Sequence, residues 1–213
     1  MTRTKGIIVL ATCLLLASAC DDGSGTGTAT STPSPATSQT PPCQNQAPEA
    51  FRTCMEQTTN PPATIIDSSK TYTATIHTAY GDIVIKLDPK LAPVTVNNFV
   101  YLAQQHFYDG LTFHRVVANF VVQGGDPKGD GTGGPLYKLP NETNSAAWVT
   151  GSLGMASSSA GVSGSQFFIV TQDAPSLATS GVYNHFGMVT SGMDVVGKIQ
   201  VGDKMTGIDI TAS

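Results

Sequence analysis

Three polar side chains stand inside two short apolar runs of this 213-residue chain, where they could do chemistry. Arg115 and Gln123 lie in the run over residues 113–126, and Gln166 lies in the run over residues 164–170. Each run reads as a β-strand, because apolar and β-branched residues fill a short stretch that glycines end. An arginine stays charged and presents a rigid fork of N–H donors, so among aromatic residues it needs a group that accepts its hydrogen bonds. The pattern predicts a hydrogen-bond donor site with aromatic rings beside it.

Taken together, the two runs resemble the cyclophilin family of peptidyl-prolyl isomerases. The resemblance covers roughly residues 70–212, and it depends on two motifs: Phe-His-Arg followed by Phe and Gln-Gly-Gly-Asp, and Gly-Ser-Gln-Phe-Phe. It implies an enzyme that isomerises Xaa-Pro bonds. The implied fold is mainly β, a closed eight-stranded antiparallel barrel capped by two helices. No metal, nucleotide or other cofactor is expected.

The resemblance also implies a role for each residue that matches a motif position. Arg115 would donate a hydrogen bond to the prolyl nitrogen, Gln123 would hold Arg115, and Phe120 would help to form the wall of a proline slot. The other implied substrate-binding residues are Val121, Gly131, Ala156, Ser157, Ser158, Gln166, Phe168, Leu177 and Tyr183.

Several of these positions differ from the family pattern. Val121 replaces the usual methionine, Ser157 replaces an asparagine, and Tyr183 stands where many members have a histidine. The tryptophan of the best-known members is missing from the loop at residues 175–177, and the one tryptophan here, Trp148, lies elsewhere in the sequence. Without that indole N–H and ring, we expect only weak binding of cyclosporin-type inhibitors.

The residues around the motifs follow the periodicities of a β-protein with a few helices. Alternating apolar residues over 72–76 and 83–87 predict an antiparallel hairpin. Pro93 opens a stretch with apolar residues at helical spacing, a second helix is expected over 193–199, and a last strand is expected over 208–211. Strand hairpins with two helices indicate a barrel or sandwich with helical caps, in agreement with the resemblance.

The first 42 residues read as a targeting segment followed by a tether. Residues 1–19 have the basic start, short apolar core and small residues of a secretory signal. Cys20, directly after three small residues, resembles the lipidated cysteine of a bacterial lipobox; the alternative is an ordinary signal cut near residue 19, which would release a secreted protein. Residues 20–42 are rich in Gly, Ser, Thr and Pro and predict a disordered linker. The expected location is extracytoplasmic, with the membrane anchor at Cys20 alone.

Residues 43–69 read as an N-terminal extension ahead of the isomerase domain at residues 70–213. Cys43 and Cys54 are the natural disulfide pair in an oxidising compartment, because the other two cysteines lie in the signal and at the lipidation position. A metal site is the weaker alternative, since no neighbouring His or further Cys completes a ligand set. Pro48 predicts the first turn of a short helix between the two cysteines.

Composition narrows the possible partners. The net charge of −4 becomes −6 when residues 1–19, with two basic residues and no acid, are removed, so no basic stripe for nucleic acid is expected. Two functions remain. One is a monomeric isomerase that acts on proline-containing unfolded or secreted polypeptides and assists their folding. The other is a binding module or chaperone on the same fold, with little turnover. The intact Arg115, Phe120 and Gln123 favour the enzyme.

Overall fold

The computed structural model describes residues 43–213, so the expected signal peptide, Cys20 and the whole linker lie outside the described residues. Within this part of the chain, no helix is long and apolar enough to cross a membrane. The elements, in chain order, are α1 (Pro48–Met55), β1 (Tyr72–Thr78), β2 (Gly81–Leu87), α2 (Pro93–Gln104), β3 (Arg115–Val117), β4 (Val121–Gly124), β5 (Ser152–Ser158), β6 (Gly161–Val170), the 3-10 helix η1 (Pro175–Ala178), β7 (His185–Ser191), α3 (Met193–Val196) and β8 (Met205–Ala212).

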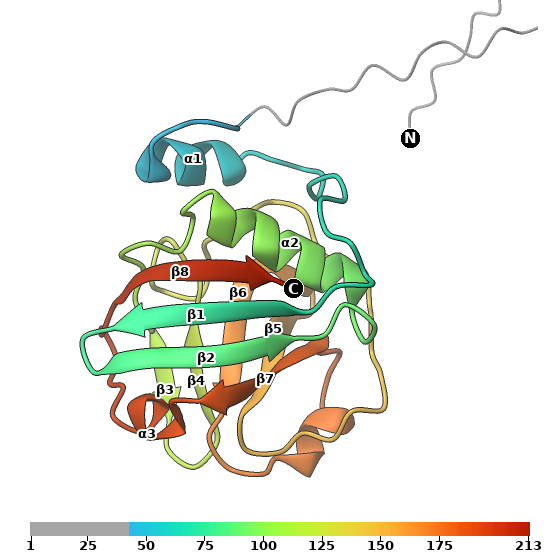
Figure 1. Cartoon of the computed structure of the whole chain (residues 1–213), viewed down its shortest axis with the longest axis vertical. Coiled ribbons are helices and arrows are strands. Elements are labelled where there is room, and N and C mark those ends of the chain that lie inside the picture. Colours follow the sequence, from blue (N-terminus) through green and yellow to red (C-terminus); the bar gives the residue numbers. More distant parts are fainter. Residues whose placement is uncertain (1–42) are drawn as a thin grey trace, which may run out of the picture. The chain divides into compact units, whose positions relative to one another are not determined.

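The eight strands form one antiparallel sheet in the order β3-β4-β6-β5-β7-β2-β1-β8. The sheet curls on itself, so that β8, β1 and β2 lie in front of β3, β4 and β6 in Figure 1. This confirms a mainly β, eight-stranded antiparallel fold. Complete closure of the barrel is not confirmed: the pairing ends at β3 and β8, and near these edges the isolated bridge Thr112–Lys204 joins the flanking segments.

The two expected helices differ in length. α2 runs for three turns and is capped by the Glu142 carboxylate, which accepts the backbone N–H groups of Val94 and Thr95, each at 2.8 Å. A carboxylate at this position also complements the positive end of the helix dipole. The second helix, expected over residues 193–199, is the single turn α3, because Gly197 is its C-cap and glycine is a poor helix former.

The sequence pattern predicted one strand over residues 113–126. This prediction was wrong, because these residues contain the hairpin of β3 and β4. The turn lies at Asn119, whose φ of 59° is in the left-handed region that asparagine tolerates, and Phe120 N–H donates to the Val117 carbonyl at 3.1 Å. The hairpin pairs Arg115 directly with Gln123. Two polar residues eight positions apart therefore become cross-strand neighbours.

The apolar residues pack into two separate clusters, and β6 contributes to both. Phe167 lies in the sheet interior, against Phe99 at 5.4 Å and Tyr108 at 5.6 Å between ring centroids. Phe168 points to the other face, into a small cluster with Trp148 and other residues outside that interior. Because side chains alternate along a strand, two adjacent phenylalanines serve two different environments.

The N-terminal extension packs into the larger cluster. It contains the expected Cys43–Cys54 disulfide, with the two Cα atoms 5.7 Å apart. Phe51, on α1, is fully buried, and its ring lies 6.0 Å from the ring of Tyr101 and 6.3 Å from that of Phe107. The residues around the disulfide are therefore part of the same hydrophobic core as the sheet.

Candidate active site

One cavity, which we call the proline slot, brings together the catalytic candidates and most of the expected binding residues. Its volume is about 230 Å³. Of its lining residues, Arg115 alone carries a charge, and it lies at the exposed edge, whereas Phe168 and Leu177 are buried. The full lining is Arg115, Phe120, Val121, Gln123, Ala156, Ser157, Phe168, Leu177 and Tyr183.

Five different segments supply these side chains, which is why they are scattered in the sequence. The β3–β4 hairpin carries Arg115 and Gln123, and its turn carries Phe120. β6 and η1 add the apolar wall, with Phe168 4% exposed and Leu177 4% exposed. The rest of the wall comes from the end of β5 and from the loop before β7. The Pro-Ser-Leu segment, read as a loop from sequence, forms η1 and buries its leucine.

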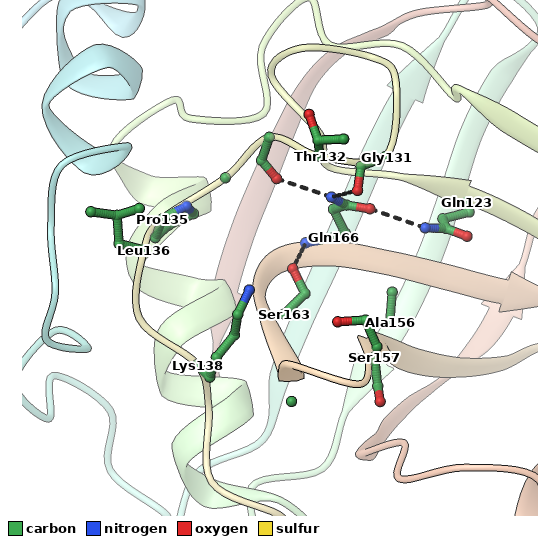
Figure 2. A pocket seen from close by; sticks show the side chains of 14 residues that line it. Gln123, Gly131, Thr132, Pro135, Leu136, Lys138, Ala156, Ser157, Ser163 and Gln166 are labelled. Carbon is green, nitrogen blue, oxygen red and sulfur yellow. Dashed lines mark hydrogen bonds between the residues drawn. The ribbon is translucent and has the colours of Figure 1, made fainter. Parts of the chain in front are cut away.

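A relay of side-chain amides runs from Arg115 into the protein (Figure 2 shows its inner part). Arg115 Nη1 faces Gln123 Oε1 at 3.4 Å, and Gln123 Nε2 donates to Gln166 Oε1 at 3.1 Å. Gln166 Nε2 in turn donates to the carbonyls of Gly131 and Gly133, at 3.0 and 2.9 Å. The long contact at Arg115 is weak, so the relay orients the arginine while leaving its other donors free.

The buried Asp126 orders the loop that ends this relay. Its carboxylate is 1% exposed and accepts the backbone N–H groups of Lys128, at 2.8 Å, and of Asp130 and Gly131. Gly133 must lack a side chain, since a Cβ there would overlap an Asp126 carboxylate oxygen. Asp126 was recognised only as part of a motif, and its role in the loop required the structure.

A second recess, of about 350 Å³, adjoins the proline slot and contains the remaining expected residues: Gly131, Ser158 and Gln166. The two cavities share lining residues on β4 and β5, namely Gln123, Ala156 and Ser157. Figure 2 shows Pro135, Leu136 and Lys138 on the opposite side of this recess. Sequence reasoning did not identify these three residues. The two cavities make a continuous groove across the ends of β4, β5 and β6.

Trp148 contributes to the site, which the sequence analysis did not anticipate. It is 6% exposed, and its ring stacks on Phe168, with 5.5 Å between centroids and 27° between planes. Gly154 makes this stacking possible, because a Cβ at that position would lie 2.4 Å from the Phe168 ring and 2.7 Å from Trp148. The sequence feature that could have pointed to Trp148 is that it is the single tryptophan of a chain with few aromatic residues.

The end of β5 offers unpaired backbone to the groove. Ladder pairing of β5 with β7 covers residues 152–154, and a final hydrogen bond joins Met155 N–H to the Asn184 carbonyl. Beyond Met155, β5 stays paired with β6 alone, through Ser157 and Ser158. An extended peptide can add to such an edge by main-chain hydrogen bonds.

Two further polar residues, Ser163 in the lining of the second recess and His114 beside Arg115, lie near the site. Ser163 Oγ accepts the backbone N–H groups of Ser165 and Gln166, at 3.2 and 3.0 Å. The half-buried His114 has a pKa below its ordinary value, mainly because burial disfavours the charged ring. Neither residue lines the proline slot. Among residues 43–213, no group of three potential ligands is placed to hold a metal ion.

Comparisons with known proteins show the family to which this chain belongs. The family described as cyclophilin type peptidyl-prolyl cis-trans isomerase/CLD matches residues 73–211. A peptidyl-prolyl cis-trans isomerase of Helicobacter pylori is 44% identical over 149 residues, covering 68% of this chain and 90% of that protein. Peptidyl-prolyl cis-trans isomerase B of Bacillus subtilis is 49% identical over 125 residues, covering 58% and 86%.

Solved structures show the same likeness. A cyclophilin type peptidyl-prolyl cis-trans isomerase of Cryptosporidium parvum matches with a TM-score of 0.58 and 29% identity, covering 67% of this chain and 98% of that chain. A structure of that isomerase in the presence of the dipeptide Ala-Pro matches with a TM-score of 0.56. The family match, the relatives and the eight-stranded fold agree that this chain belongs to the cyclophilin-type peptidyl-prolyl cis-trans isomerases and is an isomerase enzyme.

Proposed function

We propose that Arg115 lowers the barrier to Xaa-Pro rotation while the proline slot and the second recess hold the peptide on either side of the bond. The observation that carries this proposal is the composition of the slot. A single cation stands at the edge of a wall built from Phe120, Val121, Phe168 and Leu177. One of the similar solved structures, the Cryptosporidium isomerase, was determined in the presence of Ala-Pro, a dipeptide of the class proposed here as ligand.

The chemistry needs neither a nucleophile nor a metal ion. Rotation about a peptide bond has a barrier of about 18–20 kcal/mol, because the nitrogen lone pair is conjugated with the carbonyl group. For Xaa-Pro the cis and trans states differ by only about 0.5–1 kcal/mol, so both are populated and exchange slowly. In the twisted state the lone pair becomes available to accept a hydrogen bond. A donor that contacts it only then binds the transition state more tightly than the ground state.

Arg115 suits this role because a guanidinium stays charged and has several N–H donors. One of them faces Gln123, and the others are free to contact the peptide. The relay through Gln123 and Gln166 keeps the guanidinium at the slot edge before the substrate arrives. The free edge of β5 at Ala156 and Ser157 holds the extended chain while the bond turns.

The experiment compares wild type with Arg115→Ala by NMR exchange on an Ala-Pro-Phe peptide. Loss of one preorganised donor should lower the catalysed rate by about 10²–10³-fold. Circular dichroism should remain native, because Arg115 is exposed. Lys70→Ala, which removes an exposed cation outside both cavities, is the matched control and should keep the wild-type rate. Equal rates for wild type and Arg115→Ala would refute the role of Arg115. A wild type that binds the peptide without catalysing exchange would instead favour the binding-module function.

We further propose that the enzyme works outside the cytoplasm, anchored to the bacterial cell membrane through a lipidated Cys20. The signal-like residues 1–19, the small residues before Cys20 and the Cys43–Cys54 disulfide support this location. Cys20→Ser should release the protein from the membrane fraction and abolish labelling by a radioactive fatty acid. A wild type found entirely in the medium without label would favour the secreted alternative.

The proposed clients are proline-containing unfolded or secreted polypeptides, which a monomeric enzyme would help to fold. The groove contacts backbone and a prolyl ring, and it lacks the basic stripe that nucleic acid requires. A secreted protein whose refolding is limited by prolyl isomerisation should refold faster with the wild type. The Arg115→Ala variant should leave the slow phase unchanged. Acceleration by both proteins alike would point to a chaperone without turnover.

A further inference from the structure

At the proline slot and behind it, four rings from three segments form a cluster that we call the aromatic stack: His185, Trp148, Phe168 and Tyr183. Phe168 and Tyr183 line the slot, and their centroids are 5.6 Å apart with planes at 88°. Trp148 lies behind both, 5.5 Å from Phe168 and 6.3 Å from Tyr183. His185 lies behind Trp148, with the two centroids 4.9 Å apart. His185 is therefore in contact with a ring that supports the slot, although it does not line the slot itself.

His185 is a buried polar residue whose ring is not matched by hydrogen bonds. It is 5% exposed, and neither ring nitrogen has a hydrogen-bond partner within residues 43–213. Its backbone carbonyl accepts a hydrogen bond from the side-chain amide of Asn144 at 3.0 Å. A buried donor without a partner is destabilising, so this histidine carries an energetic penalty that a leucine or valine would not.

The charged groups near His185 lie on one side of it. Lys86 on β2 and Asp88 directly after β2 line a shallow recess of about 350 Å³ together with His185. The other residues of that recess, which include Ala146 and Ala147, are uncharged, and so is Trp148. Burial lowers the pKa of His185 from its ordinary value of 6.5, and the Asp88 carboxylate and the backbone of His185 itself oppose part of that effect. The ring is neutral at pH 7.

Protonation would change what this ring can contact. An imidazolium has two N–H donors and a charge, and burying them beside Trp148 without an acceptor is unfavourable. The nearest source of a negative charge is Asp88, on the recess side. A protonated ring therefore gains a partner by turning toward the recess, and it then leaves the position where it supports Trp148.

We propose that His185 is a positioning residue for the isomerase: its neutral ring holds Trp148 against Phe168, and its protonation withdraws that support and loosens the proline slot. The inference depends on the proposed role of the slot in binding the prolyl ring. Because the effect is on the slot wall and not on Arg115, it should appear in the KM for the peptide more than in kcat.

The first test needs no activity. Trp148 is the only tryptophan of the chain, so its fluorescence reports on the stack alone. An imidazolium beside an indole quenches its emission, and a wild-type titration from pH 8 to pH 5 should show a step below pH 6.5. The step should vanish in His185→Phe and in His185→Gln, the second of which keeps a polar, uncharged side chain. His114→Phe is the matched control, because His114 is another histidine whose ring nitrogens lack partners and whose pKa is lowered by burial. This variant should keep the step.

The second test measures KM and kcat for an Ala-Pro-Phe peptide over the same pH range, with each variant compared with its own value at pH 8. If peptide binding lowers the pKa of His185 by about 0.5–1 unit, linkage requires KM to rise about three- to tenfold in the protonated protein. The rise should be absent in both His185 variants and present in His114→Phe.

An emission step that persists in both His185 variants would overturn the proposal. So would a step that is lost while the rise in KM remains, because His185 would then not act on the slot. Loss of both together supports it. The fluorescence result does not depend on Arg115, so a failure of the proposed catalytic role would be seen separately, in the Arg115→Ala exchange rates.

Discussion

Removal of the Cys43–Cys54 crosslink should destabilise the whole protein and leave the active site intact. The bond closes a loop with a sequence separation of 11. In the chain-entropy description, a loop of this length constrains the unfolded state by about 3 kcal/mol at 25 °C. For a domain of this size each kcal/mol corresponds to about 2–4 °C, so Cys43→Ser/Cys54→Ser should melt about 6–12 °C lower than wild type.

Phe51→Ala gives an independent measure of how strongly the extension is attached. The ring is fully buried against Tyr101 and Phe107, and truncation of such a residue costs about 3–5 kcal/mol. Phe51→Ala should therefore lose as much stability as the double cysteine variant, or more. Neither change touches a residue that lines the slot or the second recess, so kcat/KM per folded molecule should remain at the wild-type value.

The assay is urea or thermal unfolding, with Cys20→Ser in every variant to avoid lipidation. Reductant should lower the stability of the wild type to that of the double cysteine variant and should not affect the variant itself. A double variant that melts within about 1 °C of the oxidised wild type would refute the role of the crosslink. Loss of activity per folded molecule in either variant would refute the separation between the extension and the site.

Three further outcomes follow from the structure. The protonated ring of the half-buried His77 donates hydrogen bonds to the carboxylates of Asp82 at 2.7 Å and Asp209 at 3.1 Å, and these bonds raise the pKa of His77 above 6.5. A raised folded-state pKa adds stability below pH 6.5, and this stability is lost as the pH rises through the folded-state pKa. In urea unfolding, the free energy of unfolding of wild type should therefore exceed that of His77→Gln by more at pH 6 than at pH 8; an equal difference at both pH values would contradict this. Gly154→Ala should raise the peptide KM and alter tryptophan fluorescence, because the added Cβ would overlap the slot rings; a fully functional variant would show that the rings are not held there. We expect the missing indole to weaken cyclosporin binding by about ten- to a hundredfold, and Ser176→Trp, measured by calorimetry, should recover part of that affinity; a wild type that already binds cyclosporin as tightly as a tryptophan-bearing family member would contradict this.

The sequence alone predicted the class of fold and many of the residues that line the candidate site. Strand and helix periodicities located the β1–β2 hairpin, α2 and the last strand. These predictions succeeded because alternation and helical spacing are local properties that burial on one face imposes. The residues expected from motif positions line the two adjoining cavities, but Pro135, Leu136 and Lys138, which also line the second recess, and Trp148 behind the slot were not identified from sequence.

Tertiary packing decided the features that depend on contacts between distant segments. Residues 113–126 became a hairpin because Asn119 tolerates a positive φ, and this turn set Arg115 opposite Gln123. Trp148 can stack on Phe168 because Gly154 on β5 has no side chain that would overlap the two rings.

The extension shows the same division between local and tertiary information. The disulfide could be expected from the sequence because, of the four cysteines, only Cys43 and Cys54 lie outside the expected signal and lipidation position, and an oxidising compartment was expected. That Phe51 completes the core against Tyr101 and Phe107 could not be read from the sequence. Periodicity specifies which residues need to be buried, but the partner that buries them depends on how the chain closes over itself, and only the folded structure determines that.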